Sequence, residues 1–169
     1  TRTDSYGRVW VYVYEYDDAG KIVKTTKTYS DGNIDVEEYE YNDAGKKIKE
    51  THTDSYGNID VSEYNDEGQK IKEVYTDPNG NIDVEGQKVK EVEYEYNDAG
   101  KIVKKTKTYS DGNSDVEEYE YNDAGKLVKE TKTDSDGKVD VEHEYNDAGQ
   151  KIKKTTTYSF GSVYVSEYN

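Results

Sequence analysis

Apolar and polar residues alternate along most of this chain, in runs of seven to ten residues separated by glycine-containing turns. In the run 33–41, NIDVEEYEY, the apolar residues Ile34 and Val36 are two positions apart, and Ile59 and Val61 repeat this spacing. A period of two places such residues on one face of an extended strand. Thr, Val, Ile and Tyr, which dominate these runs, suit a pleated surface. The pattern therefore predicts β-strands throughout.

Two kinds of turn alternate between these runs. The longer turn reads Asp/Asn-Asp-Ala/Glu-Gly and the shorter one ends in a single glycine, such as SDG at 30–32. Asn, Asp and Gly favour tight turns because Gly adopts positive φ and Asx side chains bond their own backbone. Parallel strands would need connections of a dozen or more residues, which the chain lacks. The fold class predicted is all-β: an antiparallel β-hairpin repeat array, a meander forming an open spiral or a solenoid-like sheet.

The repeats predict one array over residues 1–169, with about six to seven hairpin units. The pattern breaks at 85–96, where Gly86 is followed by QKVKEVEYEY without a four-residue turn. Such an irregular unit is expected of an evolved array rather than of a copied consensus design.

The runs are of two types that differ in charge. One type is lysine-rich, as in KIVKTTKTY at 21–29, and the other is acidic, as in the run at 33–41. Antiparallel neighbours would therefore alternate in sign, and cross-strand Lys–Glu pairs would favour the correct register. A shifted register would instead place like charges opposite each other.

The tyrosines of the acidic runs do not share a face with their aliphatic residues. Tyr39 and Tyr41 have the parity of Asp35 and Glu37, opposite to that of Ile34 and Val36. Either both faces are partly covered, or a β-bulge near Glu37–Glu38 switches the parity. The shorter run DVEHEY at 140–145 favours the bulge.

Composition narrows the classes of function. Leu, Ile, Val and Phe are scarce and the net charge is −15, but 19 tyrosines supply large rings that stabilise a thin fold without a thick aliphatic core. The absence of Cys excludes disulfides and thiolate metal sites. An acidic chain disfavours nucleic acid and anionic membrane as partners, and no apolar run is long enough to span a bilayer.

The segment 14–42, YEYDDAGKIVKTTKTYSDGNIDVEEYEYN, resembles the YD repeat of RHS proteins. That repeat reads Tyr-x-Tyr-Asp-x-x-Gly-Arg-Leu, followed by a Thr-rich strand and a Gly turn, and the resemblance extends from about residue 8 to 168. Matching positions include Tyr14, Tyr16, Asp17 and Gly20. After the first unit, Asn replaces the Asp, and Lys-Ile or Lys-Leu replaces Arg-Leu. The resemblance implies the hairpin architecture and a bacterial, extracellular or cell-surface setting, but six or seven hairpins are too few for the shells such arrays build.

Catalytic and metal-binding chemistry is not indicated. His52 and His143 are the only histidines and lie on runs of different type, and no Gly-x-Ser-x-Gly motif is present. Asp134, Asp136 and Asp140 resemble part of a calcium loop, but Gly137 directly follows the second Asp, which favours turn chemistry. We therefore expect no enzyme activity and no cofactor.

The two ends of the array are the most apolar parts of the chain. The first run contains Trp10, Val11, Tyr12, Val13 and Tyr14, and the last contains Val163, Tyr164 and Val165. Unguarded edge strands pair with other chains. The sequence thus predicts a structural or scaffold repeat that associates with itself through its edges, as in a fibre, or with the rest of a longer parent chain. The alternative is a carbohydrate- or cell-wall-binding module that stacks glycan on a tyrosine face.

Overall fold

The computed structural model describes residues 1–3, 9–76, 78, 89–158 and 160–168. The chain divides into two compact units, Thr1–Glu91 and Val92–Asn169, and the division falls inside the segment 85–96 that breaks the sequence pattern. Residues 85–88 of that segment, with the turns at Gly7 and Gly80, lie outside the described residues.

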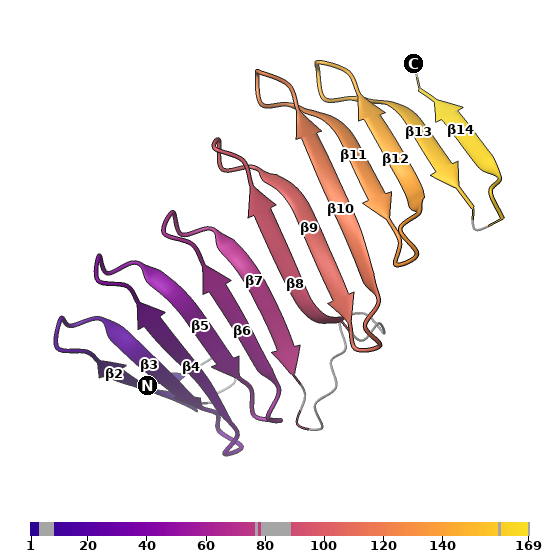
Figure 1. Cartoon of the computed structure of the whole chain (residues 1–169). Helices are drawn as coiled ribbons and strands as arrows, with labels where there is room; N and C mark the ends of the chain where they lie inside the picture. The colour runs from indigo at the N-terminus through magenta and orange to yellow at the C-terminus, as the bar shows by residue number, and fades with distance from the viewer. Residues whose placement is uncertain (4–8, 77, 79–88, 159, 169) are drawn as a thin grey trace. The chain divides into compact units, whose positions relative to one another are not determined.

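The described residues form β-strands joined by turns, without helices (Figure 1). Consecutive strands pair antiparallel, so spatial order follows sequence order within each unit, and the predicted all-β hairpin array is confirmed. The first unit contains β1 (Arg2–Thr3), β2 (Val9–Tyr16), β3 (Ile22–Thr28), β4 (Ile34–Tyr41), β5 (Lys47–Thr53), β6 (Ile59–Tyr64) and β7 (Lys70–Thr76). After β8 (Val89–Tyr96), which spans the division, the second unit contains β9 (Ile102–Tyr109), β10 (Ser114–Tyr121), β11 (Leu127–Thr133), β12 (Val139–Tyr145), β13 (Lys151–Thr157) and β14 (Val163–Glu167).

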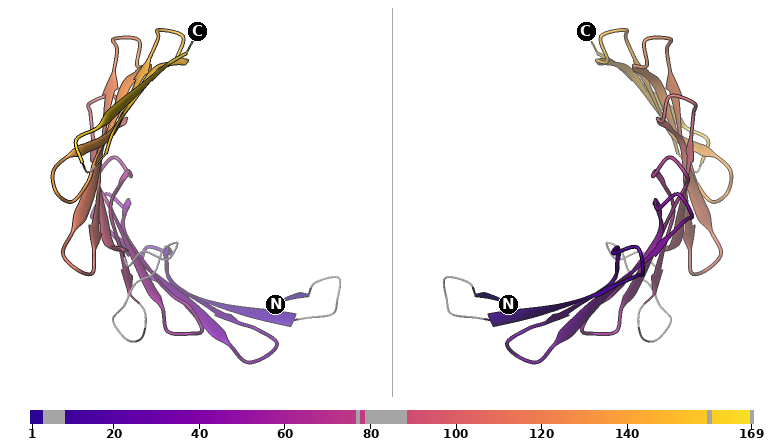
Figure 2. Two further views of the ribbon diagram at one scale, coloured as in Figure 1. Left: turned by 90° about the vertical axis from the view of Figure 1, so that its right-hand side faces the viewer. Right: turned by 90° about the vertical axis from the view of Figure 1, so that its left-hand side faces the viewer.

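Each unit is a single layer of strands, as the side views show (Figure 2). Within the described residues only Val92 and Thr25 are buried. The described part of the chain contains no helix that is long and apolar enough to cross a membrane. Stability must therefore come from contacts between neighbouring strands rather than from a closed core.

Asparagine or aspartate begins each of the long turns, where its side chain bonds the backbone. In the turn after β4, the Asn42 side-chain oxygen accepts a hydrogen bond from the Lys46 N–H at 2.9 Å, and the Gly45 N–H donates to the Asn42 carbonyl at 2.7 Å. Gly45 has φ +75° and Gly125 has φ +72°, the region that only glycine adopts without strain. The predicted turn chemistry is confirmed at both positions.

The strands alternate in type as predicted. We call β3, β5, β7, β9, β11 and β13 the lysine strands and β4, β6, β10 and β12 the acidic strands. Lys24 on β3 lies opposite Glu38 on β4, with an ion pair at 3.1 Å, and Lys153 on β13 pairs with Glu144 on β12 at 2.6 Å. Because these side chains are partly exposed, each pair adds less than about 1 kcal/mol, and their main effect is on register.

The bulge predicted near Glu37–Glu38 is wrong. Pairing of β4 with β5 is continuous from Val36 to Glu40, and the register shifts only between Glu40 and Tyr41. Ile34 and Val36 therefore lie on one face and Tyr39 and Tyr41 on the other, which is the two-faced alternative. Alternation persists because the tyrosines find polar partners on their own face. In β12 the register does shift, between Val139 and Val141.

Candidate functional site

Cross-strand register gives the first unit two chemically different faces. We call one the valine–threonine face; it carries Val11, Val13, Thr26, Thr28, Ile34, Val36, Thr51, Thr53, Ile59 and Val61. We call the other the tyrosine face; it carries Tyr12, Tyr14, Thr25, Lys27, Asp35, Glu37, Tyr39, Glu50, His52, Asp60 and Ser62. Strands β9 to β11 of the second unit repeat this division, but the register shift in β12 places Val141 opposite Lys132, on the tyrosine face.

On the tyrosine face of the first unit, phenol groups and carboxylates form a hydrogen-bonded network. The Tyr39 hydroxyl donates to Glu37 at 2.6 Å, and the Tyr64 hydroxyl donates to Glu50 at 3.0 Å. Lys47 also bonds Glu50, at 2.6 Å. Burial alone would raise the pKa of Glu50, but the hydrogen bonds from Lys47 and Tyr64 outweigh it and lower that pKa. Burial and the Glu37 carboxylate together raise the pKa of Tyr39.

The second unit carries the same kind of network. Glu130 accepts hydrogen bonds from the Tyr145 hydroxyl at 2.9 Å and lies 3.2 Å from the His143 Nδ1. Burial, together with the Glu130 carboxylate, raises the pKa of Tyr145 to about 12. His143 thus lies in a strand-to-strand polar contact, while His52 lies on another strand in the other unit, opposite Glu37 and Asp60.

Lysine side chains cover many of the tyrosine rings. The Lys47 amine lies 4.5 Å from the ring centroid of Tyr64 and 5.8 Å from that of Tyr39. Similar contacts, at 4.1–5.9 Å, cover Tyr29, Tyr41, Tyr94, Tyr121 and Tyr145. Cation–π contact stabilises the fold by about 0.5–1 kcal/mol at exposed sites. A ring face that is occupied by an ammonium group is a poor platform for stacking a sugar.

A contact between successive repeats recurs in both units. The Lys21 amine lies 5.1 Å from the ring centroid of Tyr41 and fills the space beside Gly45, where a Cβ would overlap it. In the second unit Lys101 lies 5.0 Å from the Tyr121 ring centroid and bonds the Gly125 carbonyl. In each unit a lysine that follows a long turn, Lys21 or Lys101, thus contacts the next long turn.

The sequence analysis missed this contact between repeats. The signal was present in the motif Asn/Asp-Asp-Ala-Gly-Lys, because a lysine follows the turn glycine at Lys21, Lys46, Lys101 and Lys126. Cross-strand pairing of lysine with glutamate does not predict this contact, which the Lys21 side chain makes with the next long turn.

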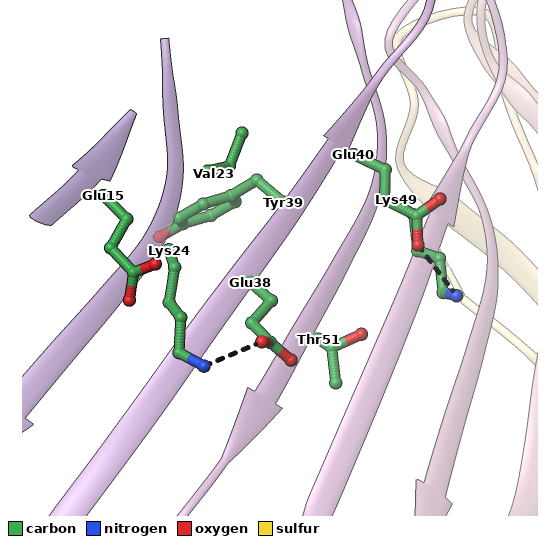
Figure 3. A pocket seen from close by; sticks show the side chains of 8 residues that line it. All are labelled: Glu15, Val23, Lys24, Glu38, Tyr39, Glu40, Lys49 and Thr51. Carbon is green, nitrogen blue, oxygen red and sulfur yellow. Dashed lines mark hydrogen bonds and ion pairs between the residues drawn. The ribbon is translucent and has the colours of Figure 1, made fainter. Parts of the chain in front are cut away.

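A shallow groove lies on the first unit, on the charged end of the valine–threonine face (Figure 3). Two ion pairs line it, Lys24–Glu38 and Lys49–Glu40, each at 3.1 Å. Val23 and Thr51 also line it. The sign of the charge here alternates from one strand to the next, so every charged side chain shown has a neighbour of opposite charge.

The predicted assembly residues lie at the outer strands. Val11, Val13 and Tyr14 on β2 are exposed, as are Val163, Tyr164 and Val165 on β14. The Tyr12 and Tyr14 rings stack at 6.3 Å. The edge of β2 is partly covered, because Arg2 and Thr3 of β1 pair with Trp10 and Val9. The structure thus separates these residues into two sets, one in each unit, rather than gathering them into one site.

The aspartates of the weak calcium candidate act in a turn. The Asp134 carboxylate accepts hydrogen bonds from the backbone N–H groups of Asp136 and Lys138, both at 3.0 Å. Asp140 lies in β12, at the register shift. No group of three or more His, Cys, Asp or Glu side chains in the described part of the chain has the arrangement of a metal site.

Taken together, alternating strand types, Asx-glycine turns and lysine contacts between turns define an antiparallel β-hairpin repeat protein. The family model described as "Protein of unknown function (DUF2963)" matches residues 5–52 and 109–157, more than half of the chain. The chain belongs to this family. A search of the curated proteins finds no match.

Solved structures are similar to this chain at low sequence identity. The structure of TcdB2-TccC3 is 16% identical with a TM-score of 0.52, covering 84% of this chain and 7% of that one. The Tc holotoxin pore of Photorhabdus luminescens is 14% identical with a TM-score of 0.41, covering 98% of this chain and 12% of that one. The chain thus spans only a small part of the length of these proteins.

Proposed function

We propose that the chain is a non-enzymatic structural repeat region of the YD-repeat type, which associates through its edge strands with further copies or with the rest of a longer parent chain. The fold shared with TcdB2-TccC3 supports the repeat architecture. The observation that carries the proposal of edge association is the loss of acidic residues from the outer strands.

The edge strands lack the acidic residues of interior strands at matching positions. Strand β2 has the length and register shift of β4, so Trp10, Tyr12 and Val13 occupy the positions of Asp35, Glu37 and Glu38. In the interior strand β4, Glu38 forms an ion pair with Lys24 of the preceding strand, β3. On β14, Tyr164 likewise occupies the position of Asp60 on β6. Loss of these charges removes the repulsion that would keep two edges apart.

Backbone geometry indicates how the β14 edge can be blocked selectively. The Tyr168 N–H donates to the Ile152 carbonyl of β13 at 2.9 Å. Since alternate residues of an antiparallel strand bond the same neighbour, the N–H groups of Ser166 and Tyr164 also point to β13. The N–H groups of Val163, Val165 and Glu167 point outward. Proline at Val165 would thus remove an outward donor and leave the pairing with β13 in place.

We expect Val165→Pro to abolish edge-to-edge growth into filaments or rings, measured by multi-angle light scattering and negative-stain imaging. Val165→Thr is the matched control, since it keeps the β-branch and the N–H, and it should associate like the unmodified chain. If the unmodified chain is monomeric at about 1 mM, or if Val165→Pro associates equally well, edge association is wrong.

A second pair of substitutions, Val11→Lys with Val13→Lys, tests the β2 edge. Lysine is a common guard of edge strands, so the double variant should stop head-to-tail growth. Such growth is heterologous and gives filaments unless the rotation closes it into a ring. Persistence of filaments in this variant would exclude β2 as the contacting edge.

The extracellular or cell-surface setting is proposed on the YD-repeat resemblance. Surface labelling of intact cells that produce the protein is the direct test, and labelling only after lysis would contradict it. Absence of enzyme activity is proposed because His143 and the network carboxylates Glu50 and Glu130 have partners within the sheet.

Carbohydrate binding remains the alternative function. Lysines cover the interior rings, so exposed tyrosines at the outer strands and turns, such as Tyr164 and Tyr56, are the residues that could stack on sugar. Saturable binding to glycan arrays, lost in Tyr164→Ala, would favour this alternative over the scaffold.

A further inference from the structure

The valine–threonine face of the first unit is covered by no other element in the described residues, although it carries exposed aliphatic side chains. Ile34 is 47% exposed, Ile59 37% and Val13 53%. A sheet face of this kind normally packs against another layer. The tyrosine face on the other side has its own network of hydrogen bonds and lysine–ring contacts, so the valine–threonine face is the one with unsatisfied apolar surface.

Charge on the valine–threonine face alternates with strand order. Across β2 to β7 the side chains are Glu15, Lys24, Glu38 with Glu40, Lys49, Glu63 and Lys72, so each acidic position is followed by a basic one. These charges lie at one end of the strands, beside the aliphatic residues. The face is therefore close to neutral, although the chain has a net charge of −15. Many of the excess acids lie in turns, such as Asp18, Asp43 and Asp66.

Side-chain size alternates in the same order. The acidic strands contribute Ile34 with Val36 and Ile59 with Val61, and the lysine strands between and before them contribute Thr26 with Thr28 and Thr51 with Thr53. Rows of larger and smaller side chains thus follow one another at the spacing of neighbouring strands, about 4.8 Å.

We propose that this face docks on the same face of a second copy, through a two-fold axis that runs parallel to the strands and passes between β4 and β5. Rotation about this axis lays β4 over β5 of the partner copy, β3 over β6 and β2 over β7. The acidic positions then face lysine strands, the Ile and Val rows of β4 and β6 face Thr rows, and the valines of β2 face Val74 and Thr76 of β7. An axis through a strand would place Glu38 against Glu38 and Ile34 against Ile34, which is unfavourable in charge and in shape.

This contact is independent of the edge association. Pairing at the edges extends a layer, whereas docking of faces joins two layers, about 10 Å apart as in β-sandwiches. A chain with Val165→Pro should therefore still form face-to-face dimers, and failure of either proposal leaves the other testable.

The first experiment is sedimentation velocity of the full chain carrying Val165→Pro, at concentrations up to about 500 µM. We expect dimers, weakened roughly tenfold or more by Ile34→Lys with Ile59→Lys, because the apolar contact is lost. Tyr56→Lys is the control: Tyr56 is 78% exposed in the turn between β5 and β6, away from the face, and its replacement should leave dimers intact. Monomers of the parent chain at all concentrations would overturn the proposal, as would equal dimerisation of both variants.

A charge-swap experiment tests the axis and does not depend on the aliphatic variants folding. One chain carries Lys24→Glu with Lys49→Glu, and a second carries Glu38→Lys with Glu63→Lys. Each alone should be monomeric because like charges face each other, and an equimolar mixture should form heterodimers. Circular dichroism verifies that both chains are folded. Dimers of either chain alone, or no heterodimer between two folded chains, would overturn the assigned axis.

Discussion

The hydroxyl of Tyr41 donates a hydrogen bond to the carbonyl oxygen of Ile22, 2.8 Å away and 19 residues earlier in the chain. The second unit repeats this bond between Tyr121 and the Ile102 carbonyl, at 2.9 Å. Ile22 and Ile102 are the first residues of β3 and β9, at the point where lysine strands leave the long turn. The second tyrosine of each Tyr-x-Tyr motif therefore fastens its strand to the preceding repeat.

Loss of this hydroxyl should destabilise the chain measurably. We expect Tyr41→Phe to lower the free energy of unfolding by about 1 kcal/mol, because a part-buried carbonyl loses its side-chain donor while the ring stays. Urea denaturation measures the change. Tyr56→Phe, at an exposed turn position, is the control and should have no effect. Equal effects of the two substitutions would show that the Tyr41 bond contributes nothing.

Turn glycines should matter more than exposed charges. Gly45→Val should cost more than about 1 kcal/mol, since valine disfavours positive φ and its side chain would displace Lys21. At Gly20, with φ +80°, no atom lies within 4 Å of a new Cβ, so Gly20→Val isolates the cost of the backbone conformation. Gly125→Val should resemble Gly45→Val, because Lys101 lies beside it. Lys49→Ala should stay within about 0.5 kcal/mol, and a loss as large as that of Gly45→Val would contradict this ranking.

Stability should decline in alkaline solution. Burial, with hydrogen bonding to Asp115 and Glu130 respectively, raises the pKa of Tyr109 and of Tyr145 to about 12. Unfolded tyrosine titrates near pH 10, so the unfolded chain loses these protons first. The stabilisation is therefore complete below about pH 10 and is lost as pH rises to about 12. Urea unfolding at successive pH values measures the slope. Tyr109→Phe with Tyr145→Phe should flatten the slope, and an unchanged slope would assign the alkaline sensitivity to other groups.

Calcium should have little effect on stability. Asp134 already accepts two backbone hydrogen bonds, so its carboxylate completes a turn without a metal. We expect millimolar Ca²⁺ and EDTA to leave the melting temperature unchanged. A rise of about ten degrees in Ca²⁺ that EDTA reverses would instead indicate a cation site at Asp134, Asp136 and Asp140.

The strands, turns and charge pairs could be predicted because each depends on residues close in sequence. Gly45 and Gly125 have the positive φ that their turn motif requires, and Lys24 lies opposite Glu38 as strand alternation requires. Local pattern also correctly separates Val36 from Tyr39. Parity alone leaves both a two-faced sheet and a bulge open, and it favours the bulge because it does not show that Tyr39 has a polar partner, Glu37, on its own face.

Contacts between repeats were harder to predict than contacts within a hairpin. Tyr41 at the end of β4 bonds Ile22 at the start of β3, 19 residues earlier, and Lys21 reaches the Gly45 turn, about one repeat away. Periodicity gives the spacing of such residues but not the direction of their side chains. Composition indicates that the edge residues Trp10 and Tyr164 are unusual. The register then shows that they stand at positions where β4 and β6 carry aspartate.

Contacts between elements join only consecutive strands in the described residues. The packing of a strand therefore does not depend on any strand several positions away. Residues 21–46 and 101–126 differ at two positions only, Thr25 against Lys105 and Ile34 against Ser114. Coding sequences this similar are substrates for unequal recombination, which inserts or deletes whole repeats. Because each of these two segments supplies both the lysine and the glycine of the contact between turns, the joint formed by such an exchange would preserve that contact, and the length of the protein is free to vary over generations.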